Sequence, residues 1–186
     1  EASDYGEHLV YEIADFDVTL RIEDERKDLT IAASAPAETL GETIHYRHEN
    51  ARNFAWSVSH AYQVTRQTVG DITILSYAFP FDQAAGNMAR NTAADALSLY
   101  SRIYIPYQHK FLSVVEADFP DGMETDGMFF LGNSFYNWHQ ETAAEYLVSI
   151  SAHETAHQWW YALVGNDQAL EPWLDEALCT YSERLF

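Results

Sequence analysis

A short motif near the C-terminal end, His153-Glu154-Thr155-Ala156-His157, constrains this chain more than any other feature. The two histidines are four residues apart, and Glu176 follows after eighteen further residues. On an α-helix, residues four apart lie on one face, about 6 Å apart along the axis. Two imidazoles in that arrangement can bind one metal ion, and Glu154, beside the first of them, can reach a water on that ion. The sequence therefore predicts a helix with a metal site.

The residues around the motif favour a long, buried helix. Thr142 and Glu145 form a capping-box pattern, and neither Gly nor Pro follows until Gly165. This predicts one continuous helix with the motif in its middle. Apolar residues cover most of its circumference, which is typical of a buried helix: Leu147, Val148, Ile150, Ala152, Ala156, Trp159, Trp160, Leu163 and Val164. Buried histidine and glutamate side chains need partners, and a metal ion would supply one.

A second helix is expected to bring Glu176 to the two histidines. Pro172 suits a first helical turn, and an apolar arc follows it: Trp173, Leu174, Ala177, Leu178 and Tyr181. Two histidines and a glutamate form a catalytic zinc set that leaves one position for water, so we expect one Zn²⁺ per chain. Two alternatives stay open. Cys179 could be a thiolate ligand, although a small buried residue is the preferred interpretation, and the motif could be a chance pair of solvated histidines.

The spacing and the flanking residues resemble the aminopeptidase N family of gluzincin zinc metallopeptidases. That family carries His-Glu-x-x-His, eighteen residues, and then Glu in a Trp-Leu-x-Glu context. Here Gln158-Trp159-Trp160 and Pro172-Trp173-Leu174-Asp175-Glu176 are similar to the family's flanks. The resemblance implies a thermolysin-like catalytic domain that hydrolyses peptide bonds, with Glu154 as the general base.

A second motif of the family, Gly-x-Met-Glu-Asn, is matched in part by Asp121-Gly122-Met123-Glu124-Thr125. The resemblance implies that Gly122, Met123 and Glu124 bind substrate, and that the Glu124 carboxylate holds the free amino terminus of a peptide. The outer Gly and Asn of the family motif are replaced here, so a zinc endopeptidase with the same centre is an alternative. Without the resemblance, Glu124 in this Asp- and Gly-containing segment would be interpreted as a loop carboxylate.

The resemblance extends from about residue 50 to the end of the chain. Members of that family are several times longer, and a tyrosine that stabilises their tetrahedral intermediate follows well after the third ligand. We therefore expect this sequence to be a fragment, with that tyrosine beyond residue 186.

Charge and composition exclude several classes of function. The net charge of −19 excludes ordinary electrostatic binding of nucleic acid. Between Phe111 and Glu183 there are thirteen Asp or Glu residues and no Lys or Arg, and such a field favours a metal cation and a cationic substrate terminus. The single cysteine excludes an internal disulfide framework. We find no signal or membrane segment in these residues, and no pattern that fixes a compartment.

The order of the predicted elements is that of an α+β protein. Several stretches between His8 and about Thr68 alternate with a period of two, and residues 1–68 are interpreted as the C-terminal part of a β-rich N-terminal domain. Residues 69–186 are interpreted as the N-terminal part of the catalytic domain. The second part contains expected strands at 72–77, 111–115 and 128–131, an expected helix at 84–104, and the two metal-site helices. Residues 36–41 are expected to be a turn.

The remaining histidines are interpreted as surface residues rather than ligands: His8, His45, His48, His60, His109 and His139. One further alternative belongs to a different class, namely an inactive, metal-free domain that serves as a scaffold. The intact set of three ligands with Glu154 argues against it, because an inactive site has no need of a general base.

Overall fold

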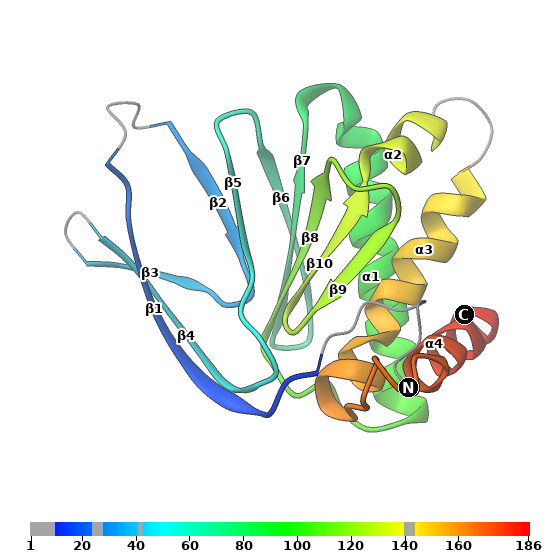
Figure 1. Cartoon of the computed structure of the whole chain (residues 1–186). Coiled ribbons are helices and arrows are strands. Elements are labelled where there is room, and N and C mark those ends of the chain that lie inside the picture. Colours follow the sequence, from blue (N-terminus) through cyan, green and yellow to red (C-terminus); the bar gives the residue numbers. More distant parts are fainter. Residues whose placement is uncertain (1–9, 24–27, 41–42, 140–143) are drawn as a thin grey trace.

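The computed structural model describes residues 10–23, 28–40, 43–139 and 144–186. Strands dominate the first part of these residues and helices the last part (Figure 1). The strands are β1 Ala14–Arg21, β2 Thr30–Ala33, β3 Ala37–Leu40, β4 Thr43–Ala51, β5 Trp56–Ser59, β6 Gln63–Val69, β7 Ile72–Ala78, β8 Phe111–Ala117, β9 Gly122–Thr125 and β10 Met128–Gly132. The α-helices are α1 Gln83–Ile103, α2 Asn133–His139, α3 Ala144–Ala156 and α4 Trp173–Leu185. The molecule is thus mixed α and β, consistent with the expected α+β class.

A five-stranded sheet in the order β6-β7-β8-β10-β9 forms the centre of the molecule. Its three inner strands run parallel, while β6 and β9 pair antiparallel at the two edges. Two smaller antiparallel sheets, β1-β4-β3 and β2-β5, lie on one side of it, and the helices lie on the other (Figure 1). The sheet therefore separates a β layer from a helical layer.

The larger hydrophobic core lies between the sheet and the helices. An alanine-rich face of α1 packs there against apolar side chains of the inner strands and of α3. A smaller cluster, with Tyr62, Tyr77 and Met128, fills the opposite face of the sheet. Alternate residues of the inner strands thus serve two cores, as expected for strands that are buried on both faces.

The motif helix differs from its prediction. Thr142 lies outside the described residues, and α3 ends at Ala156 instead of continuing to Gly165. A π-helical turn follows at Gln158–Leu163, and the backbone of Trp160 and Tyr161 leaves the helical region there. The motif therefore sits at the C-terminal end of its helix, not in the middle.

Two further expectations and one alternative interpretation were wrong. Residues 36–41 were expected to be a turn, but Ala37–Leu40 form β3, which pairs with β4. The interpretation of Glu124 as a loop carboxylate is also wrong, because Glu124 lies in β9 and pairs with Phe129. His48 was expected at the surface, but its side chain is buried.

None of the helices in the described part of the chain has the length and apolar character needed to span a lipid bilayer.

Candidate metal centre

Helices α3 and α4 bring His153, His157 and Glu176 together. The His153 Nε2 atom lies 3.2 Å from Glu176 Oε2, and His157 Nε2 lies 3.7 Å from Glu176 Oε1. Nitrogen and oxygen donors bind zinc at about 2.0–2.2 Å in a tetrahedron, so neighbouring donors of one ion lie roughly 3.4 Å apart. The three side chains thus have the chemistry and the spacing of a zinc site.

The outer nitrogens of both imidazoles also have partners. The Nδ1 atom of His157 lies 3.1 Å from the carbonyl oxygen of Trp160. A carbonyl only accepts, so Nδ1 carries the proton and Nε2 keeps its lone pair for a ligand bond. The non-helical backbone at Trp160 orients this carbonyl. The break after α3 therefore fixes the tautomer of a candidate ligand.

Glu183 is the outer partner of His153. Its Oε2 atom lies 3.5 Å from His153 Nδ1, on the side of the ring opposite to Glu176. Glu176 and Glu183 are seven residues apart, or two turns of α4, and so share one helix face. That spacing was the signal in the sequence that could have identified Glu183.

The charges at this centre shift the pKa values of its members. Burial opposes protonation of His153, but the Glu176 and Glu183 carboxylates raise its pKa overall. Burial lowers the pKa of His157, and the neighbouring His153 adds to the effect. The hydrogen bond from His153 lowers the pKa of Glu176. An anionic carboxylate and a neutral His157 are the forms that bind a metal ion.

Cys179 does not join this group. Its side chain is fully buried, and the thiol lies 3.7 Å from the Trp160 carbonyl oxygen. Burial raises the pKa of this thiol well above its ordinary value, which disfavours the thiolate that would bind a metal. The structure supports the interpretation of Cys179 as a buried core residue.

Glu154 and Glu124 share a pocket with the candidate ligands. The pocket encloses about 210 Å³ and is lined by Asp121, Gly122, Glu124, Ile150, His153, Glu154 and Glu176. Both Glu124 and Glu154 are buried side chains. Gly122 allows the close approach of β9 to α3, because a Cβ atom at this position would overlap the Glu154 carboxylate. The pocket therefore holds four carboxylates and one imidazole, and it favours a cation.

Strand geometry divides the residues of the second motif. Gly122 and Glu124 are two residues apart in β9, so the Glu124 side chain and the position of a Cβ atom on Gly122 are on the same face of the strand, towards α3. The Met123 side chain projects to the other face. Met123 is absent from the residues that line the pocket. The side chain of Thr125 is buried and donates a hydrogen bond of 2.6 Å to the Met128 carbonyl, so it serves the turn into β10.

The sequence did not indicate the residues that hold Glu124 in place. Gln168 Nε2 donates a hydrogen bond of 2.9 Å to Glu124 Oε1, and the same amide group contacts the Asp175 carboxylate. Gln168 comes from the loop before α4, which has no regular pattern that could have indicated a buried role. One amide therefore bridges two buried carboxylates beside the pocket.

Comparison with known proteins finds a relative that aligns with most of this chain. The chain is 31% identical over 140 residues to aminopeptidase N of the dog, Canis lupus familiaris. This suggests the aminopeptidase N family. The aligned region covers 70% of this chain and 14% of the relative, so the chain spans a small part of that protein's length. No protein-family model matches the chain.

Proposed function

We propose that this chain carries the zinc centre of an aminopeptidase, which removes N-terminal residues from peptides. The observation that carries the proposal is the pocket in which two candidate ligands, His153 and Glu176, lie beside the buried carboxylates of Glu154 and Glu124. His157 completes the ligand set from the adjacent turn of the helix. When bound, zinc would lower the pKa of a coordinated water and polarise the scissile carbonyl.

Glu154 is the proposed general base. It follows His153 directly on α3, is buried, and opens into the same pocket. Its carboxylate would accept the proton of the attacking water and deliver it to the leaving amine, which is the ordinary sequence of general base and general acid catalysis. Gly122 opposite leaves no side chain between this carboxylate and β9.

Glu124 is the proposed anchor for the amino terminus of the substrate. Its carboxylate lies in the pocket on the β9 side and is oriented by the Gln168 amide. Four carboxylates line the pocket without a lysine or arginine, which supports a substrate with a free, cationic N-terminus. The alternative is a zinc endopeptidase with the same centre, motivated by Asp121, which lines the pocket where the family motif has Gly.

The test combines zinc content with hydrolysis in the complete natural protein. Glu154→Gln keeps the size of the side chain but removes the base, so we expect zinc to be retained and turnover to fall by at least about 100-fold. Glu176→Ala should lose one equivalent of zinc by elemental analysis. Glu145→Gln, an exposed position on the same helix, is the control and should behave as the wild type.

The choice of peptide separates the alternatives. Cleavage of free but not of N-acetylated peptides is expected, and Glu124→Ala should selectively impair the free ones. Equal cleavage of both would favour the endopeptidase. Unchanged hydrolysis by Glu154→Gln would reject the assigned base, and a wild type that neither binds zinc nor cleaves peptides would leave the scaffold interpretation.

A further inference from the structure

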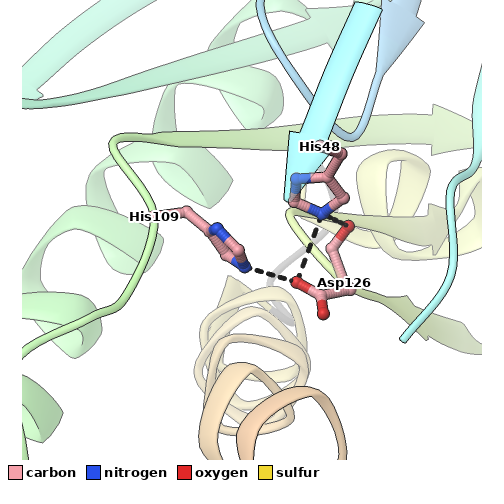
Figure 2. Close-up of side chains that lie close together, drawn as sticks. All are labelled: His48, His109 and Asp126. Carbon is pink, nitrogen blue, oxygen red and sulfur yellow. Dashed lines mark hydrogen bonds and ion pairs between the residues drawn. The ribbon is translucent and has the colours of Figure 1, made fainter. Parts of the chain in front are cut away.

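A second group of potential metal ligands lies apart from the pocket, where β4 meets the five-stranded sheet. His48 comes from β4, His109 from the segment before β8, and Asp126 from the turn between β9 and β10 (Figure 2). The Nε2 atoms of both imidazoles lie near one oxygen, Asp126 Oδ1, at 3.3 Å from His48 and 2.8 Å from His109. His48 Nε2 also lies 3.2 Å from the backbone carbonyl oxygen of Asp126. Three segments distant in the sequence thus place three donor atoms together.

The carboxylate of Asp126 is held firmly from its other side. Its Oδ2 atom accepts a hydrogen bond of 2.8 Å from the backbone N–H of Arg52, and its own N–H donates to Asn53 Oδ1 at 2.8 Å. Asp126 is 1% exposed and His48 4%. The Oδ1 atom therefore faces the two imidazoles in a fixed orientation, and the carboxylate needs a positive partner in this buried place.

The backbone next to Asp126 is shaped to admit His48. Gly127 has a φ of +74°, and a Cβ atom there would lie 3.1 Å from His48 Cε1 as well as overlapping a backbone oxygen of Ser34. The His48 ring also contacts the His109 ring, with centroids 4.5 Å apart. The turn thus brings both rings to the same side of the carboxylate.

We propose that His48, His109 and Asp126 form a second site for a divalent transition-metal ion of the zinc type. Their ligand atoms all lie within 4.8 Å of one another, as do those of His153, His157 and Glu176. The separation of 3.3 Å between His48 Nε2 and Asp126 Oδ1 matches the roughly 3.4 Å expected between neighbouring donors of a tetrahedral zinc ion. Imidazole nitrogens favour such an ion over Ca²⁺ or Mg²⁺.

An ion and its water ligand would have a route to this site. A cavity of about 340 Å³ adjoins the cluster and is lined by both imidazoles, with Arg47, Glu49 and Asn50 of the β4 end around it. His109 keeps 19% of its side chain exposed, so a modest movement of this ring would open the 2.8 Å contact to the length needed for ligation. The fourth position of a tetrahedral ion would be occupied by water from this cavity.

Such an ion would link the β layer to the strand pair that carries the pocket. Asp126 follows Glu124 by two residues, and the N–H of Gly127 donates 2.9 Å to Gln158 Oε1 beside the motif helix. Occupancy of the second site would therefore stabilise the turn behind β9. The competing account is a metal-free hydrogen-bonded contact, in which His48 Nε2 donates to the Asp126 carbonyl oxygen and a proton on one imidazole supplies the positive charge. Metal binding would displace the proton from His48 Nε2.

Zinc stoichiometry distinguishes the two accounts. Titration of the chelator-stripped complete protein with Zn²⁺ against a chromophoric chelator should give two tight equivalents for the wild type and one for His109→Ala. His60→Ala, an exposed histidine outside the cluster, is the matched control and should keep two. Equal zinc binding by His109→Ala and the wild type would overturn the second site.

A second measurement covers the case in which His109→Ala does not fold. In a His153→Ala/His157→Ala double variant the proposed catalytic centre is removed, and Co²⁺ titration should still give about one equivalent with the visible absorption of a four-coordinate ion. No bound Co²⁺ in this folded variant would overturn the proposal and leave the hydrogen-bonded contact. The Co²⁺ titration does not depend on hydrolysis, so it tests the second metal site independently of the aminopeptidase proposal.

Discussion

The side chain of Gln168 makes two contacts that orient carboxylates beside the pocket. The amide of Gln168 is 2% exposed and lies between the carboxylates of Glu124 and Asp175, which are 1% and 2% exposed. Two buried carboxylates repel each other, and a donor between them offsets that repulsion. The orientation of the proposed amine anchor therefore depends on a residue that belongs to neither motif.

We expect Gln168→Ala to lower the free energy of unfolding by about 1–3 kcal/mol, because both carboxylates lose a hydrogen-bond donor in a buried place. Denaturant unfolding measures the change. Gln63→Ala, an exposed glutamine in β6, is the control and should stay within about 0.5 kcal/mol of the wild type. A Gln168→Ala protein as stable as this control would show that the Gln168 hydrogen bonds do not stabilise the fold.

At the scale of elements, the face of α4 that carries Glu176 and Glu183 contributes to the candidate metal centre together with α3. Both carboxylates contact His153, one at each ring nitrogen. A carboxylate on the outer nitrogen orients a histidine ligand and raises its basicity, and the loss of such a partner typically costs 10–100-fold in metal affinity.

Glu183→Gln should therefore weaken zinc binding at the His153, His157 and Glu176 centre by roughly 10-fold or more. Competition titration with a chelator measures this directly and requires no substrate. Glu171→Gln removes a charge from an exposed position before α4 and controls for the general loss of negative charge. Equal weakening by both variants would mean that Glu183 acts only through the overall field.

The sequence predicted the elements well where local pattern determines them. The helix at 84–104 and the strands at 72–77, 111–115 and 128–131 lie within one or two residues of α1, β7, β8 and β10. The break after α3 could not be predicted, because its partners are distant. Arg52 Nε donates to the Tyr161 carbonyl at 2.6 Å, and Asn53 donates to the Tyr161 hydroxyl at 2.8 Å, from more than 100 residues away.

The same reason explains which parts of the candidate sites were missed. His153 and His157 could be paired from helical spacing, and Glu176 from its place beside the apolar arc of the next helix. His48 and Asp126, in contrast, are 78 residues apart and share no periodic pattern. Their proximity follows from the packing of β4 against the turn between β9 and β10. A histidine judged by its neighbours in sequence is therefore interpreted as a surface residue.

At the scale of the whole molecule, a buried carboxylate on β8 links stability to pH. Glu116 is 1% exposed, and its Oε2 atom accepts a hydrogen bond of 2.8 Å from the Phe79 N–H. Burial raises the pKa of Glu116 to about 7; the Phe79 hydrogen bond opposes the shift and the nearby Asp82 adds to it. The folded protein therefore holds this proton at pH values where the unfolded chain, with a carboxyl pKa of about 4.5, has released it.

When the folded state binds more protons than the unfolded state, the free energy of unfolding falls as pH rises. For Glu116 this loss runs from about pH 4.5 to about pH 7. Glu116→Gln carries no titrating proton, and its amide oxygen can still accept from Phe79. We therefore expect the variant to gain stability relative to the wild type across this window, by roughly 1–3 kcal/mol at pH 8 compared with pH 4.5.

Denaturant unfolding of both proteins at pH 4.5, 6 and 8 tests this expectation, with chelator present so that metal binding does not vary with pH. The difference between the two proteins cancels the titrating groups that do not interact with Glu116. A difference that grows between pH 4.5 and pH 7 and then levels off identifies Glu116 as the source. A difference that is constant with pH would mean that this carboxyl titrates at its ordinary pKa in the folded protein, and that the centre of the sheet tolerates its charge.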